Sequence, residues 1–185
     1  MKTEYRLAQT LKTMMSEEMS LDNISVMELS KKCKVNRQTF YYHFHDIYDL
    51  LTLVYLNEKI VDIELSKNPK DMLKKIFEYF KNNRNFVKET LDSAGKELFL
   101  EFINNNCYQT FIALLNKVDN KSVLTDSEKK SIARYNAAGF AFQIIFYLDN
   151  FKSPTQEGLF QNFNAISDDF LQKAIENVVQ KRSTK

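Results

Sequence analysis

The sequence predicts an all-α protein built from nine helices. Glycine and proline are scarce, with three and two residues among 185, which argues against a many-turned β architecture and favours long helices. Apolar residues recur at intervals of three and four along most of the chain, as in the series Leu7, Leu11, Met14 and Met15. This is the periodicity of a helix that buries one face, so helices are expected throughout.

Four helices are expected in the first third of the chain. Ser25 is suited to cap the second of them, and Glu28, three residues later, completes a capping box. Asn36 can cap the third helix and Asp46 the fourth, because both side chains accept hydrogen bonds from the free amides at a helix start. The expected ranges are residues 3–19, 25–33, 36–43 and 46–67.

Five further helices are expected beyond Pro69, and most of them are longer. Their expected ranges are residues 71–83, 86–91, 94–118, 125–150 and 155–180. The change in helix length near residue 66 predicts a small N-terminal unit of residues 1–66 and a C-terminal bundle of residues 67–185.

Composition narrows the classes of function. No N-terminal stretch has the pattern of a signal peptide, and the longest apolar run, around residues 137–148, is too short to span a bilayer. The two cysteines, Cys33 and Cys107, lie far apart in sequence and suggest no disulfide framework. We therefore expect a cytoplasmic protein with no membrane partner. Without a glycine-rich phosphate loop or a nucleophile motif, we expect neither an enzyme nor a bound cofactor.

The segment from Ser25 to His43 has the spacing of a helix-turn-helix. In that motif the second helix enters the major groove and reads bases near its N-terminus, where this chain has Arg37, Gln38 and Thr39. Arginine can pair with guanine, glutamine with adenine, and the threonine methyl with a thymine methyl. One turn later, hydroxyl and imidazole groups can hold phosphate oxygens. The residues expected to contact double-stranded DNA are Ser25, Lys34, Asn36, Arg37, Gln38, Thr39, Tyr41, Tyr42 and His43.

The charge distribution favours a local interface over a generally basic protein. The net charge of the whole chain is only +2, and residues 1–66 hold 8 cations against 10 anions. Residues 25–45, by contrast, carry a net charge of +3. Because duplex DNA repels a negative surface, the basic segment of this unit is the part expected to approach DNA.

Residues 24–51 resemble the DNA-binding signature of TetR-family transcription regulators. The matching residues are Ile24-Ser-Val-Met-Glu-Leu-Ser-Lys-Lys-Cys-Lys-Val-Asn-Arg-Gln-Thr-Phe-Tyr-Tyr-His-Phe44, followed by Asp49-Leu50-Leu51. The resemblance implies a nine-helix TetR-like fold with a three-helix DNA-binding unit at its N-terminus. It also implies a homodimer that binds a palindromic operator and is controlled by a small-molecule effector or a co-regulator at the C-terminal domain.

A second resemblance covers residues 127–139, Ser-Glu-Lys-Lys-Ser-Ile-Ala-Arg-Tyr-Asn-Ala-Ala-Gly, which are similar to a segment of the dihydroxyacetone kinase regulators (DhaS-like). It implies regulation of dihydroxyacetone kinase genes together with a co-activator protein. Two residues depart from the TetR pattern. Lys34 occupies a turn position where glycine is common, so left-handed backbone strain is expected there. Ile47 replaces a lysine that contacts phosphate, which leaves His45 or Tyr48 for that contact.

The C-terminal bundle holds most of the phenylalanines, and a structural core accounts for most of them. The family resemblance implies an inducer pocket there, with apolar walls and a few polar tips; the ligand-binding residues expected on that basis are Tyr79, Phe102, Tyr108, Arg134 and Tyr135. The last two expected helices are apolar on more than one face, and pairing across a two-fold axis would cover the excess. The residues in excess are Phe142, Ile145, Phe146, Phe160, Phe163, Phe170 and Leu171.

Two other interpretations stay open. In one, the C-terminal domain chiefly binds a partner protein, and the chain is an interaction module. In the other, Cys33, His43 and His45 belong to a zinc-responsive regulator. Cys33 falls on a buried apolar stripe, however, and the two histidines lack the spacing of paired helical ligands, so no metal site is expected.

Overall fold

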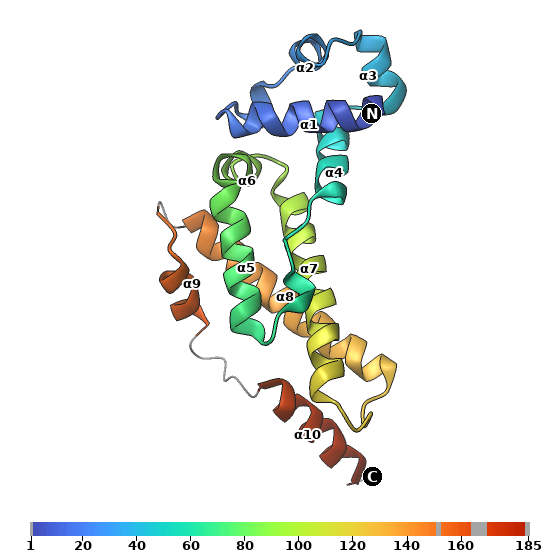
Figure 1. The fold of residues 1–185 in the computed structure, drawn as a ribbon, viewed down its shortest axis with the longest axis vertical. Helices are drawn as coiled ribbons and strands as arrows, with labels where there is room; N and C mark the ends of the chain where they lie inside the picture. Colours follow the sequence, from blue (N-terminus) through green and yellow to red (C-terminus); the bar gives the residue numbers. More distant parts are fainter. Residues whose placement is uncertain (1, 151–152, 164–169, 184–185) are drawn as a thin grey trace. The chain divides into compact units, whose positions relative to one another are not determined.

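The computed structural model describes residues 2–150, 153–163 and 170–183. Within these ranges every regular element is helical, which confirms the all-α prediction. Figure 1 traces the helices in chain order, with two short 3-10 turns, η1 (Leu21–Asn23) and η2 (Ile63–Leu65), between them. The helices are α1 (Thr3–Ser16), α2 (Val26–Lys32), α3 (Arg37–His43), α4 (Ile47–Asn57), α5 (Pro69–Asn82), α6 (Arg84–Leu91), α7 (Lys96–Val118), α8 (Asp126–Asn150), α9 (Gln156–Asn162) and α10 (Phe170–Ser183).

The chain divides into two compact units, of which the first comprises Met1–Lys59 and Phe80–Phe102. α1 packs against α2, α4 and α6. Its apolar stripe of Leu7, Leu11, Met14 and Met15 is buried, as the periodicity predicted. Complete burial stabilises by about 1.5–3 kcal/mol for each such side chain, so this stripe organises the core of the unit.

α1 and α4 both end earlier than expected, for local backbone reasons. Glu18 adopts a left-handed conformation with φ 65°, and the amide of Met19 bonds back to the carbonyl of Met14, which closes α1 at Ser16. α4 stops at Asn57 because Glu58 is extended. The chain then turns through a left-handed Asp62, φ 55°, into η2 instead of continuing the helix to residue 67.

The second unit comprises Ile60–Tyr79 and Ile103–Lys185, and an aromatic cluster marks its core. The Phe140 ring on α8 lies 4.7 Å from that of Phe163, 6.1 Å from that of Phe170 and 5.0 Å from that of Phe111 on α7. The single helix expected over residues 155–180 is wrong: α9 ends at Asn162, where Phe163 has left the helical conformation, and α10 is described from Phe170.

The two compact units are defined by contacts within the chain, and they do not coincide with the functional domains expected on either side of residue 66. α6 and the first part of α7 belong with the N-terminal helices, whereas the boundary near residue 66 separates expected roles and stays a prediction. No helix in the described ranges is long and apolar enough to cross a membrane.

Candidate nucleic-acid interface

α2, a tight turn and α3 form a helix-turn-helix whose local structure follows from its capping residues. Ser25 Oγ accepts the Glu28 N–H at 3.2 Å and the Glu28 carboxylate accepts the Ser25 N–H, which confirms the capping box. The hydrogen bonds from Ser25 lower the pKa of Glu28. Asn36 caps α3 by accepting the Thr39 amide at 2.7 Å. Lys34 has φ 55°, the predicted left-handed conformation, which costs a non-glycine residue about 1–2 kcal/mol.

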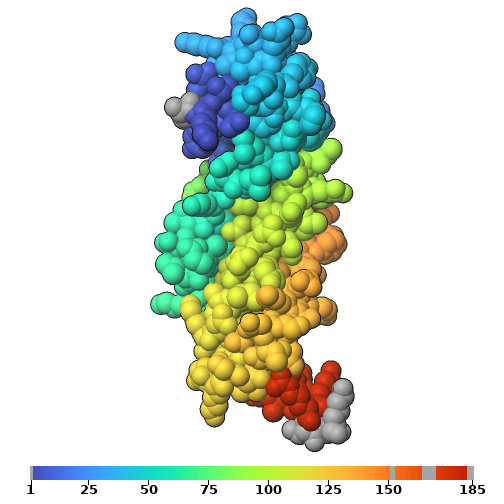
Figure 2. Space-filling view, turned by 90° about the vertical axis from the view of Figure 1, so that its right-hand side faces the viewer, coloured from blue at the N-terminus to red at the C-terminus, as the bar shows by residue number. Residues whose placement is uncertain are grey.

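α3 is anchored on one side and open on the other. Phe40 is completely buried, while Arg37 and Gln38 are exposed and Tyr41 and Tyr42 expose 59% and 84% of their surfaces. Figure 2 shows the surface over this segment in light blue. We call the four exposed residues the α3 face; they lie on neighbouring turns of one side of the helix. A cation, an amide and two phenols are the donors that base edges and phosphates accept.

Two other residues predicted to contact DNA also hold the unit together. The Thr39 hydroxyl donates to the Asn36 side-chain oxygen at 2.9 Å, so chiefly its methyl group is left to meet a base. His43 Nδ1 lies 3.1 Å from the Glu4 carboxylate of α1, and its side chain is only 20% exposed. The DNA contacts of these residues stay predictions, and they would compete with the bonds already formed.

At the start of α4, the two side chains expected to replace the missing lysine at Ile47 differ in their partners. The Tyr48 hydroxyl donates to the Asp22 carboxylate at 2.6 Å, and this hydrogen bond raises the pKa of Tyr48. Tyr48 is thus committed to a partner within the chain. His45 remains exposed, with its backbone N–H donating to Asp49, so it is the better placed of the two side chains.

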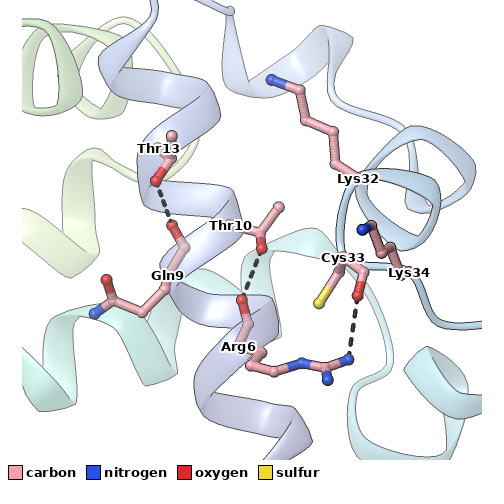
Figure 3. A pocket seen from close by; sticks show the side chains of 7 residues that line it. All are labelled: Arg6, Gln9, Thr10, Thr13, Lys32, Cys33 and Lys34. Atoms are coloured by element: carbon pink, nitrogen blue, oxygen red, sulfur yellow. Dashed lines mark hydrogen bonds between the residues drawn. The ribbon is translucent and has the colours of Figure 1, made fainter.

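A pocket of about 480 Å³ opens between α1 and the end of α2 (Figure 3). Arg6, Gln9, Thr10 and Thr13 line it from one face of α1, and Lys32, Cys33 and Lys34 line it from the turn. Arg6 donates to the Cys33 carbonyl at 3.1 Å across the pocket. Arg6 is not among the residues predicted from sequence because its partner lies 27 residues away, although the polar i, i+3, i+4, i+7 stripe on α1 is a sequence signal for this face.

The five residues predicted to bind a ligand differ widely in burial. Tyr79 and Phe102 are buried, Tyr108 is half-buried, and Arg134 and Tyr135 are exposed on α8. Phe102 belongs to the first unit, where its ring lies 5.4 Å from that of Tyr55, and the other four belong to the second. Exposed side chains do not line an enclosed pocket, so the structure does not gather these residues into one site, and their role stays a prediction.

The exposed face of α8 carries an apolar stripe. Tyr135 is 83% exposed, Phe142 63% and Phe146 49%, and the two phenylalanine rings stack 6.5 Å apart. Ala138 and Gly139 share this face, and a Cβ added at Gly139 would meet nothing within 4 Å. We call these five residues the α8 stripe. Other members of the predicted apolar excess face their own unit and are buried: Ile145, Phe163 and Leu171.

Metal-ligating side chains are not clustered in the described parts of the chain: no group of three or more His, Cys, Asp or Glu residues could hold an ion there. Cys33 is a free, buried thiol, as its place on the apolar stripe predicted.

Comparisons with known proteins agree with this architecture. A solved structure named "Dihydroxyacetone kinase operon activator DhaS" is similar to this chain with a TM-score of 0.61 and 22% identity, over 94% of this chain and 96% of that chain. At this identity the likeness shows a shared fold. No curated protein matches the sequence.

The all-helical fold with a helix-turn-helix near its N-terminus is that of a transcription regulator. The family model described as a TetR-type "Transcriptional regulator C-terminal region" matches residues 67–169, more than half of the chain. The chain belongs to the TetR family of transcriptional regulators. This match lies outside residues 24–51, so it confirms the resemblance from an independent part of the sequence.

Proposed function

We propose that the protein is a homodimer that binds a palindromic operator through α3, within a DNA-binding domain of residues 1–66. The observation that carries the proposal is the donor-rich α3 face, held outward by buried Phe40. Arg37 and Gln38 stand at the helix N-terminus, where base edges are read. Tyr41 and Tyr42 follow one turn later, where a hydroxyl can donate to phosphate.

The dimer is proposed to form through the α8 stripe. Burying apolar surface stabilises by about 25 cal/mol for each Å². In a dimer with a two-fold axis, the same stripe of each subunit faces that of the other. Gly139 lets the two backbones approach closely, because no atom of its own unit fills the space beside it. Two recognition helices must then lie about 34–36 Å apart, or a multiple of that spacing.

Control is proposed to pass from a regulatory domain of residues 67–185 to α3 through α4. The Tyr55 hydroxyl of α4 donates to Thr90 of α6 at 2.8 Å, and burial raises the pKa of this tyrosine. Leu51 of α4 lies against Gly95, where a Cβ would come within 2.7 Å of it. A small-molecule effector or co-activator that displaces α6 would therefore move α4. The free energy available for this shift is the difference in the effector's affinity for the two states.

We further propose a cytoplasmic regulator of dihydroxyacetone kinase genes that acts with a co-activator protein. The name of the similar structure and the resemblance of residues 127–139 support this assignment. A second candidate is an interaction module whose C-terminal domain chiefly binds a partner protein, and the exposed α8 stripe favours it because its apolar side chains also suit a different protein. The described geometry offers nothing in favour of the zinc-responsive alternative.

Selection of binding sites from a random duplex pool tests the proposal directly. We expect a palindromic winner whose affinity falls steeply with salt, because cations on the protein replace counterions on DNA. The winning sequence would then be searched for upstream of kinase genes. If well-folded protein enriches no sequence, with or without candidate co-activator, operator binding is refuted and the interaction module is favoured.

A further inference from the structure

The pocket between α1 and the end of α2 concentrates positive charge within residues 1–66, which hold 8 cations against 10 anions. Three of its lining residues are cations, namely Arg6, Lys32 and Lys34, and none of the described residues that line it is acidic. A hollow of about 480 Å³ is large enough for a phosphate group with part of the molecule that carries it.

The three cations keep donors to offer. Arg6 uses one N–H for the Cys33 carbonyl, and a guanidinium has five. Lys32 pairs with Glu17 at 2.8 Å, but both side chains are about half exposed, and such surface pairs are weak and exchangeable. The Lys34 side chain has no described partner, and the residue occupies a left-handed position, where glycine would remove the strain but also the charge.

The neutral side chains of the pocket limit what can bind. The Thr10 and Thr13 hydroxyls donate to backbone carbonyls of their own helix, at 2.8 and 2.9 Å. Figure 3 shows both bonds and the reach of Arg6 across the hollow. The Gln9 amide donates to the Tyr5 hydroxyl at 3.2 Å. The polar groups left over are therefore mostly the charged donors of the three cations, which favour an anion rich in acceptor oxygens.

We propose that this pocket binds a phosphate group through Arg6, Lys32 and Lys34. The group belongs to a free phosphorylated molecule, so the proposal is independent of operator reading by α3, and a backbone phosphate of a bound duplex is the competing outcome of the test. Because the pocket lies directly before α3 in the chain, an occupant would brace the turn that positions the recognition helix.

The test follows the Arg6 side-chain Nε–H signal in NMR spectra of the full chain, assigned with Arg6→Lys. One titration uses inorganic pyrophosphate and a second uses a random-sequence duplex. The test variant combines Lys32→Gln with Lys34→Asn, since asparagine tolerates the left-handed conformation. The matched control is Lys31→Gln, on the same helix but outside the pocket.

A saturable shift with pyrophosphate supports a free phosphate ligand, and we expect the double variant to weaken it by about tenfold while the control does not. A shift with duplex alone overturns the proposal and assigns these cations to the DNA backbone. In that case the slope of log affinity against log salt should fall by about one for each phosphate that the variant no longer binds. The proposal is overturned if neither probe moves the Arg6 signal, or if the double variant responds as the control does.

Discussion

α3 and α8 both expose aromatic side chains, yet what surrounds the rings differs between them. On the α3 face each ring carries a hydroxyl and stands beside a cation or an amide. On the α8 stripe the phenylalanines carry no polar tip and share their side with Ala138 and Gly139. Burying the first surface against an apolar partner would leave donors without acceptors, which costs free energy. Burying the second removes only apolar area from water, which stabilises.

The comparison teaches that exposure alone does not identify a partner. The polar groups beside the exposed rings identify the partner, because they determine whether it must supply hydrogen-bond acceptors or only a matching apolar surface. On this reasoning α3 is suited to nucleic acid and α8 to a second copy of the chain. Substitutions on the two surfaces should therefore have different effects.

The largest effect is expected from Phe142→Glu in the α8 stripe. A carboxylate in an apolar dimer interface is strongly unfavourable, so the affinity for a palindromic operator should fall by about 100-fold or more. Analytical ultracentrifugation should show monomers that unfold at nearly the normal temperature, because Phe142 is mostly exposed. Gln109→Glu, at an exposed position on α7, adds the same charge and should leave the dimer intact. A dimer that persists in Phe142→Glu would place the interface elsewhere.

A smaller, sequence-dependent effect is expected from Arg37→Ala on the α3 face. Loss of a bidentate base contact should cost about 1–3 kcal/mol on the selected operator and relax preference at one base pair. Tyr42→Phe is the matched comparison, because it removes one phosphate donor and should weaken binding evenly across sequences. Fluorescence anisotropy with selected and random duplexes measures both. Equal losses on the two duplexes for Arg37→Ala would remove Arg37 from the base-reading residues.

Gly139→Ala should have opposite effects in the monomer and the dimer. In the Phe142→Glu background, the added methyl meets open space and should raise the free energy of unfolding by about 1 kcal/mol through helix propensity. In the otherwise unchanged chain it should weaken dimerisation, because two backbones could no longer approach as closely. Urea unfolding and sedimentation are the measurements. An unchanged dimer affinity would show that Gly139 is not at the crossing point.

The smallest effect is expected from Lys34→Gly in the turn before α3. Relief of the left-handed strain, offset by the extra chain entropy of glycine, should stabilise the protein by up to about 1 kcal/mol. Lys31→Gly is the control with the opposite sign, since it places glycine inside α2 and should destabilise by about 1 kcal/mol. Urea unfolding compares the two. Destabilisation by Lys34→Gly would mean that the lysine side chain contributes more than its backbone strain costs.

Local features of the interface could be predicted from sequence because their causes are local. Ser25, Asn36 and Asp46 each cap the expected helix, since the side chain and the amide that it accepts are three residues apart. The strain at Lys34 was predictable for the same reason. The bonds that tie these helices together were not: Glu4 to His43, Arg6 to Cys33 and Asp22 to Tyr48 each join residues more than twenty positions apart.

In the C-terminal helices, by contrast, the main features could not be predicted from the sequence. α8 has apolar residues around much of its circumference, so periodicity could not tell the buried Ile145 from the exposed Phe142. Nor could it place the end of α9 at Asn162, because the apolar spacing of the sequence continues past that point. The sequence by itself determined the helical class, the caps and the donor set of α3, since these depend on neighbours along the chain. Only the tertiary structure decided which apolar side chains remain exposed and which cations surround one pocket, because packing between distant segments sets both.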